Sequence, residues 1–343
     1  MNRGMIFAGL AVLAGLTSTA HAAEKCSSLA RSPYADFQAT FHDHDRVKPA
    51  APGITKKFTA YTSTVDDQDD DTGDGQADFR VSPIYVAYEL RGVAPGAAGN
   101  YDEPALSVDG PSSWYSSEEL VPMVESIPGV TKKRIDSSYD GIGSIWNRGH
   151  MAMNDHAQRI GFEAACNTHN FFNAAPQAAE LNQGPWRHLE NYSAAASNKF
   201  RSVWVVAGPI FDPATPSLFI GDPGEVPVEV PDAFFKVIIH EGPSGIETLA
   251  FIFPQPNVAA AGGTPVPAAS WVKCSGAAPA GFEYNHEPSL VSIADIERLT
   301  GIRFFEGRED REALISFRAQ RLWPVETPYW DSTAQCRGQR FHR

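Results

Sequence analysis

A histidine and an arginine flank a glycine in WNRGHMAM, residues 146–153, and are the first candidates for chemistry. Polar and charged groups are costly to place among apolar neighbours unless they are paired or used. An imidazole has an ordinary pKa of about 6.5, so His150 can accept a proton near neutral pH. Arg148 can stabilise negative charge in a transition state. For a single histidine in an apolar stretch, structural packing is the alternative explanation.

Two common hydrolytic motifs are missing around this histidine. A nucleophilic serine in a hydrolase would sit in G-x-S-x-G, and neither GIGSIW nor EGPSGI has that spacing. A zinc peptidase would carry H-E-x-x-H, whereas His150 and His156 are wrongly spaced and lack the glutamate.

The segment THNFFNAAPQAAELNQGPWRHLENY, residues 168–192, supplies partners for His150. It predicts a short strand over 170–172, a turn at Pro176, and a helix that begins near Leu181 or Asn182. Pro185 is tolerated only in the first turn of that helix, and Trp186, Leu189 and Ala196 fit its buried side. With a strand that carries His150, this is a β–β–α unit. Asn182 and Glu190 are about two turns apart on its helix, so both can lean towards one side.

Together, NRGH, FFNAAPQ and LNQGPWRHLE resemble the DNA/RNA non-specific endonucleases, the ββα-metal nucleases that include secreted bacterial nucleases and endonuclease G. VAYEL upstream and VSIADIERLTGIRFF downstream also resemble flanking segments of that family. The resemblance covers roughly residues 79–306. The combined motif is highly specific, whereas RGH alone would be weak.

The resemblance implies a role for each matching residue. His150 corresponds to the general base that deprotonates water, and Asn182 to the single protein ligand of one Mg²⁺ ion, for which Mn²⁺ can substitute. Waters and phosphate oxygens would fill the other positions, as magnesium prefers. Glu190 corresponds to the acid that orients the metal-bound waters, and Asn173 to an asparagine that positions the catalytic groups.

Two arginines complete the implied site. Arg148 corresponds to an arginine that stabilises the pentacoordinate phosphate, and Arg134 is the best match to a second phosphate-binding arginine. The implied activity is hydrolysis of DNA and RNA to 5′-phosphate products, without sequence preference because phosphate and sugar carry no base information. The alternative is a catalytically silent relative that binds nucleic acid or calcium.

Asn147 departs from the family pattern, which usually has aspartate at this position. If the aspartate anchors the turn by hydrogen bonds, Asn147 can replace it. If the aspartate holds Arg148 by charge, activity should be lower and Asn147→Asp should raise it. We favour the anchor.

The N-terminus predicts export. Arg3 precedes an apolar run over 5–16, and Ala20-His21-Ala22 fits a signal-peptidase site, so we expect a signal peptide over 1–22. We expect an N-terminal extension over 23–78, a nuclease domain over 79–310 and a C-terminal tail over 311–343 packed on that domain. We expect no membrane association after cleavage, and periplasmic or extracellular location.

Export favours disulfide bonds between the four cysteines, for which three pairings exist. We prefer Cys26–Cys336 with Cys166–Cys274, because chain termini often lie close together.

The net charge of −13 argues against a polyanionic substrate, but much of the acid lies in VDDQDDDTGDGQAD, residues 65–78. Basic residues elsewhere can still form a local phosphate-binding cleft. Within the acidic stretch, Asp70, Thr72, Asp74 and Asp78 have the spacing of a calcium loop. A solvated acidic linker is the alternative.

Strand-like segments outnumber helical ones and cluster in the sequence. They are expected within residues 57–65 and 79–92, over the buried run 202–211, and as an antiparallel hairpin of FFKVIIHEG and ETLAFIFPQ. SIADIERLTG predicts a helix with Ser292 as N-cap and Gly301 as its end. We therefore predict an α+β fold around an antiparallel sheet, with flanking helices and the ββα-metal motif.

Overall fold

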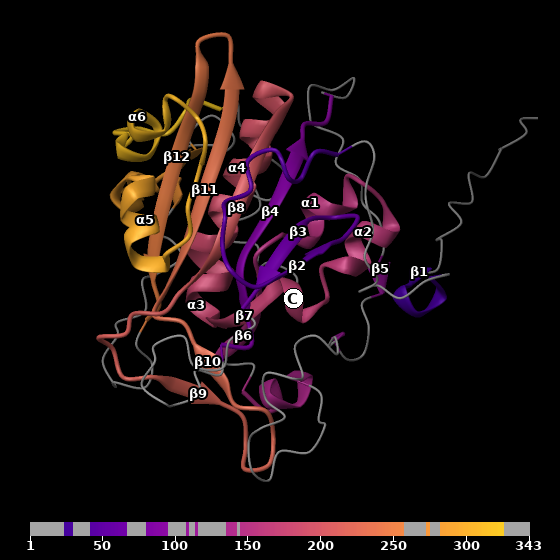
Figure 1. Ribbon diagram of the computed structural model, residues 1–343. Coiled ribbons are helices and arrows are strands. Elements are labelled where there is room, and N and C mark those ends of the chain that lie inside the picture. The colour runs from indigo at the N-terminus through magenta and orange to yellow at the C-terminus, as the bar shows by residue number, and fades with distance from the viewer. Residues whose placement is uncertain are drawn as a thin grey trace, which may run out of the picture.

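An antiparallel sheet forms the centre of the protein (Figure 1). The computed structural model describes residues 24–29, 42–66, 80–94, 108–109, 114–115, 135–142, 145–256, 272–274 and 282–325. Within them, seven strands pair in the order β15-β12-β11-β8-β4-β3-β2. Their bounds are β2 Ile54–Lys57, β3 Thr62–Val65, β4 Pro83–Arg91, β8 Ser202–Ile210, β11 Ala233–Gly242, β12 Gly245–Pro254 and β15 Leu290–Val291. Every pairing in this sheet is antiparallel. The predicted α+β class is confirmed.

The expected hairpin is β11 and β12, which pair from Ala233↔Pro254 to Gly242↔Gly245. Gly245 has φ +117°, a conformation that glycine adopts without steric cost. The buried run 202–211 is the sheet strand β8. Residues 57–65, in contrast, do not form one strand, because the chain turns at Phe58–Tyr61 and separates β2 from β3.

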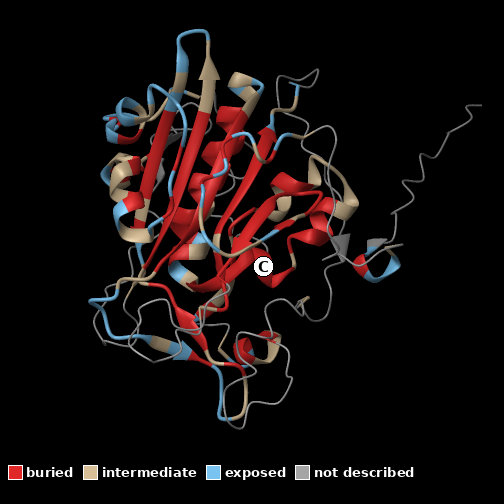
Figure 2. Ribbon diagram, viewed as in Figure 1, coloured by how far each residue is buried: buried red, intermediate tan, exposed pale blue. Residues whose placement is uncertain are grey.

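Helices cover both faces of the sheet. They are α1 Asn154–Gln158, α2 Phe162–Asn167, α3 Ala179–Leu181, α4 Arg187–Phe200, α5 Ile293–Thr300 and α6 Arg311–Ser316. One hydrophobic cluster joins α4 to the sheet, and a second joins α5 and α6 to the opposite face. Side chains along β11 alternate between them, so Phe234 and Ile238 face the α4 side whereas Phe235 and Val237 face the α5 side. The central strands and α4 are almost entirely buried (Figure 2).

α5 shows how local sequence sets an element. The Ser292 hydroxyl accepts the Asp295 N–H, and the Asp295 carboxylate accepts the Ser292 N–H, which makes a capping box. Gly301 ends the helix at φ +72°. The predicted N-cap and end of the helix are confirmed, and Ile293 and Ile296 on it are completely buried.

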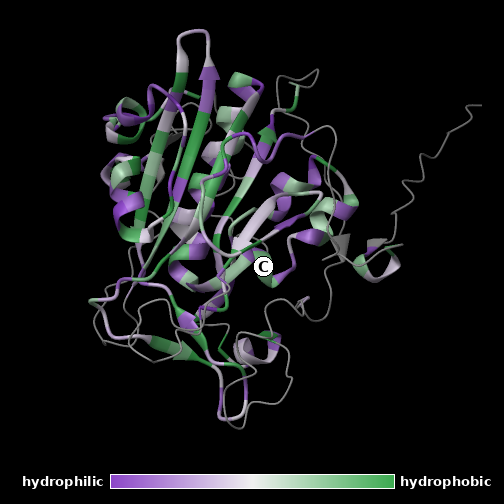
Figure 3. Ribbon diagram, viewed as in Figure 1, coloured by the Kyte–Doolittle hydropathy of each residue, from purple (hydrophilic) through white to green (hydrophobic). Residues whose placement is uncertain are grey.

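Four two-stranded sheets complete the described fold: β1 Glu24–Lys25 with β5 Val108–Asp109, β6 Trp146–His150 with β7 Ala174–Ala178, β9 Leu218–Ile220 with β10 Val228–Val230, and β13 Val272–Cys274 with β14 Phe282–Tyr284. Apolar residues dominate the long strands of the central sheet (Figure 3). Within the described residues, no helix combines the length and apolar character needed to cross a lipid bilayer.

Candidate active site

The β–β–α unit places His150 at the end of β6. β6 and β7 pair antiparallel with His150 opposite Ala174 and Gly149 opposite Ala175, and α3 and α4 follow. Gly149 is required by packing, because a Cβ there would lie 2.5 Å from the side chain of Gln177. The motif glycine therefore lets the two strands approach each other beside the histidine.

The second strand begins later than the sequence predicts. Residues 171–173 form one 3-10 turn, in which the Asn170 side chain accepts the Phe172 N–H, and β7 starts at Ala174. Pro176 lies inside β7 and not in a turn. A two-stranded sheet has two outer edges, and the missing N–H of proline is tolerated at an edge.

The imidazole of His150 packs against two aromatic rings and is half-buried. Its ring centroid lies 4.7 Å from that of Trp114 and 5.6 Å from that of His169. Nε2 is buried and has no hydrogen-bond partner within the described part of the chain. Burial, and then the charge of His169, lower the pKa of His150 to about 3. The ring is therefore neutral at physiological pH, the form that can accept a proton.

Asn173 fixes the main chain that follows His150. Its Oδ1 accepts the Ala152 N–H at 2.7 Å, and its Nδ2 donates to the carbonyls of Ala152 at 2.9 Å and Thr168 at 3.0 Å. Its own carbonyl accepts the Met151 N–H. The side chain is completely buried. Asn173 thus acts as a clamp on the turn after β6.

Asn147 connects β6 to the start of the helix. Its Oδ1 accepts hydrogen bonds from the side-chain amides of Asn182 and Gln183, both at 3.0 Å. Asn182 donates this hydrogen bond through its own Nδ2. The Oδ1 of Asn182 therefore points away from Asn147. This geometry matches the anchor role we favour for Asn147; its effect on activity stays a prediction.

Arg148 is held by the 3-10 turn Ile135–Tyr139. Its Nη2 lies 2.7 Å from Asp136 Oδ1 and 3.8 Å from Asp140 Oδ1, and its guanidinium carbon stands 5.2 Å from the Tyr139 ring centroid. Two aspartates from another segment therefore supply negative charge that balances Arg148.

Glu190 is buried on the side of α4 that faces the sheet. Its Oε1 lies 3.6 Å from Lys236 Nζ on β11, and its backbone carbonyl faces His156 Nε2 at 3.1 Å. Lys236 also stands 3.9 Å from the ring centroid of Trp186, whose Nε1 donates to the His150 carbonyl at 3.1 Å. Glu190 is linked to His150 through these two side chains.

The comparisons with known proteins agree with this geometry. The profile of the DNA/RNA non-specific endonucleases matches residues 75–311. The chain belongs to this family. It is 31% identical to nuclease EXOG, mitochondrial, of Mus musculus over 48% of this chain and 41% of that protein. It is 32% identical to endonuclease G, mitochondrial, of Homo sapiens over 47% of this chain and 49% of that protein.

The chain therefore spans about half the length, or less, of these two curated relatives. Among solved structures, the crystal structure of the EndoG/EndoGI complex matches with a TM-score of 0.51 and 18% identity, over 76% of this chain and 88% of that one. This likeness supports the fold of the endonuclease family.

Sequence reasoning missed two residues of the site. Trp114 comes from a region with no motif, and only its contact with His150 reveals it. Lys236 could have been found from the sequence, because it is a single lysine inside the apolar run FFKVII. A buried charge in such a run needs a partner.

The disulfide preference is wrong. Cys26 pairs with Cys166, with 5.5 Å between their Cα atoms, so neither Cys26–Cys336 nor Cys166–Cys274 forms. The turn Cys26–Ser28 packs beside α2, which carries Cys166, so this N-terminal segment contacts the β–β–α region of the protein.

Several predicted residues lie outside the described residues: Arg134, the signal segment 1–22, Cys336, and the calcium-loop candidates Asp70, Thr72, Asp74 and Asp78. Among the residues that are described, no cluster of three or more His, Cys, Asp or Glu side chains could hold a metal ion.

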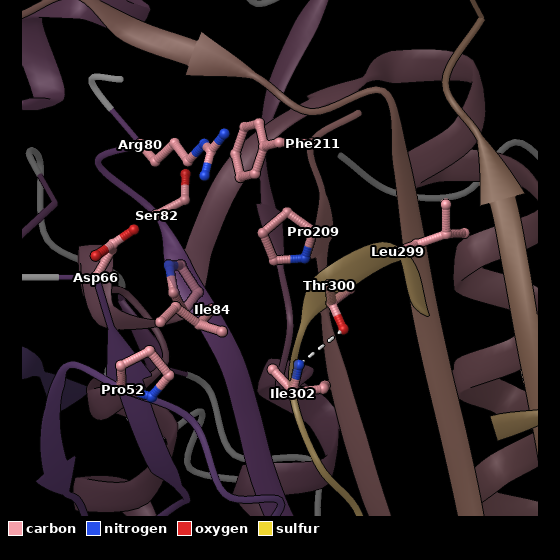
Figure 4. Close-up of a pocket in the computed structure, with 11 residues that line it drawn as sticks. Pro52, Asp66, Arg80, Ser82, Ile84, Pro209, Phe211, Leu299, Thr300 and Ile302 are labelled. Atoms are coloured by element: carbon pink, nitrogen blue, oxygen red, sulfur yellow. Dashed lines mark hydrogen bonds between the residues drawn. The ribbon is translucent and has the colours of Figure 1, made fainter. Parts of the chain in front are cut away.

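A cavity of about 150 Å³ opens elsewhere, near the ends of β4 and β8 and α5 (Figure 4). Arg80, Ser82 and Phe211 line one side, and Leu299 and Ile302 the other. None of the predicted catalytic residues contributes to it, so the hollow is separate from the β–β–α unit.

Proposed function

We propose that this chain is a metal-dependent endonuclease that hydrolyses phosphodiester bonds in DNA and RNA. The observation that carries the proposal is His150, a neutral imidazole with a buried Nε2 that lacks a partner within the described residues, on the β–β–α unit of a non-specific endonuclease. We assign Nε2 as the acceptor of the proton from the attacking water.

The residues at the start of the helix fit a magnesium ion. Asn147 fixes the amide of Asn182 through its nitrogen, which orients the amide oxygen as a hard, neutral ligand. One neutral ligand leaves the remaining positions for water and phosphate oxygens. When bound, Mg²⁺ or Mn²⁺ would neutralise charge on the phosphate and the leaving 3′-oxygen.

The remaining predicted site residues position the base or bind the substrate and the metal-bound waters. Asn173 fixes the turn after His150, so the imidazole keeps one position. Arg148 is held by Asp136 through Nη2. A guanidinium has five N–H donors, so the others can bind the scissile phosphate. Glu190 would orient waters around the metal, and Arg134 would bind a second phosphate. The products would carry 5′-phosphates.

We also propose that the protein is exported, although the two relatives named above are mitochondrial nucleases by name. The segment over 1–22 supports this, and so does the Cys26–Cys166 disulfide, because disulfides persist in oxidising compartments. N-terminal sequencing of the protein from its native host should find a chain that starts at Ala23. A chain that still starts at Met1 would contradict export by this signal.

The calcium proposal for the acidic stretch is independent of the nuclease. Calorimetric titration with Ca²⁺ should show a binding event that the double substitution Asp70→Asn and Asp74→Asn removes. No heat of binding with the unaltered protein would remove this site.

Digestion of plasmid DNA and of structured RNA tests the nuclease directly. Cleavage of both with Mg²⁺, its loss with EDTA, and its loss in His150→Ala would support the proposal. Intact substrates with the wild-type protein and Mg²⁺ would overturn it and favour a silent relative that only binds nucleic acid.

A further inference from the structure

A lysine lies in the middle of the apolar strand β11 with its ammonium enclosed in the protein. Lys236 is 0% exposed, although its neighbours in FFKVII form the hydrophobic core. A buried ammonium is costly unless a partner compensates for the lost water. The position therefore calls for a role beyond packing.

The contacts of Lys236 connect the sheet to the candidate active site. Its Nζ stands 3.9 Å from the Trp186 ring centroid and 3.6 Å from Glu190 Oε1. Trp186 and Glu190 are four residues apart, a spacing that puts them on one face of the helical segment. Trp186 in turn donates its Nε1–H to the carbonyl of His150.

We propose that Lys236 is a positioning residue for the nuclease reaction, which fixes the Glu190 carboxylate and the Trp186 ring behind His150. The inference rests on the proposed nuclease function. Lys236 would not touch the nucleic acid; it would act through Glu190 and through the main chain of the base.

The charges around Glu190 make Lys236 the main electrostatic partner of this carboxylate. Burial raises the pKa of Glu190, whereas the charges of Lys236 and then Arg187 lower it, and Asp155 raises it. His156 faces the backbone carbonyl of Glu190 and not its carboxylate. Without Lys236, less positive charge offsets the effect of burial, so the pKa of Glu190 rises. The carboxyl then stays protonated up to a higher pH.

The test compares kcat, KM and the pH profile of defined-duplex cleavage with Mg²⁺ in Lys236→Met, Glu190→Gln and the double variant. Lys236→Met should lower kcat about tenfold or more, since one lost charge contact is worth more than about 1.4 kcal/mol. KM should change little, part of the loss should recover at higher pH, and the double variant should lose clearly less than the product of the two single losses. Lys236→Arg, which keeps the cation, should be clearly more active than Lys236→Met.

Lys199→Met is the matched control. It removes a lysine that stands 5.2 Å from the Phe200 ring centroid at the other end of α4, and kcat should not change. Should Lys236→Met fail to fold, Lys236→Gln replaces it and is interpreted in the same way.

Wild-type kcat in Lys236→Met, or a multiplicative loss in the double variant, would overturn the positioning role. Absence of cleavage by the wild-type protein would instead overturn the proposed function, so the two failures can be distinguished.

Discussion

The Asn173 clamp gives the most quantitative prediction. Asn173→Ala removes three hydrogen bonds between a completely buried side chain and the backbone of Ala152 and Thr168. With about 1 kcal/mol for each bond, the free energy of unfolding should fall by about 3 kcal/mol. For a domain of this size, that lowers Tm by roughly 6–12 °C.

In Asn173→Ala, kcat should fall by more than the loss of folded protein explains. The clamp sets the turn after His150, and a displacement of the base by about 1 Å can cost about a hundredfold in rate. Urea unfolding and kcat, both measured below the lowered Tm, separate the two effects. Asn198→Ala is the matched control, because that side chain accepts one hydrogen bond, from the Val93 N–H at 2.9 Å.

The control should lose about 1 kcal/mol of unfolding free energy and keep its kcat. A loss of stability in Asn173→Ala no larger than that in Asn198→Ala, or wild-type kcat in folded Asn173→Ala, would refute the clamp role of Asn173.

Three further outcomes are expected. Trp114→Ala admits water to the imidazole, so the pKa of His150 should rise from about 3 towards its ordinary value in an NMR titration; an unchanged pKa would contradict burial as its cause. Asn147→Ala, which loses two hydrogen bonds, should lower kcat about tenfold or more, whereas Asn147→Asp keeps an oxygen that can accept both bonds and should stay within about threefold; a large rise in the aspartate variant would favour the charge explanation. Reduction of the Cys26–Cys166 bond, which closes a loop of 140 residues, should lower the free energy of unfolding by about 5 kcal/mol in urea titrations, and a peptide map with Cys26 joined to Cys336 would contradict the pairing.

The sequence predicts those elements whose signals are local. β8, the β11–β12 hairpin and α5 follow from apolar runs, a tight turn and the Ser292 cap, each contained in a few neighbouring residues. The sequence also predicts that Asn147, His150 and Asn182 share one short β–β–α unit, which is where they lie; their catalytic roles stay predictions.

The remaining features depend on contacts between distant segments. The Cys26–Cys166 pairing depends on the N-terminal turn packing beside α2, which no spacing rule contains. Trp114 and Lys236 reach the site from separate parts of the chain. The start of β7 was misplaced because the Asn170 side chain caps a 3-10 turn over residues that have strand propensity.

Chemical rescue of His150→Ala tests the central claim most directly. The substitution should reduce the rate of plasmid cleavage with Mg²⁺ by about a hundredfold to ten-thousandfold, the usual contribution of a general base. Added imidazole, which can enter the space left by the ring, should restore part of that rate in proportion to its neutral form. It should not restore Asn182→Ala. Wild-type cleavage by His150→Ala without imidazole would show that His150 is not the base.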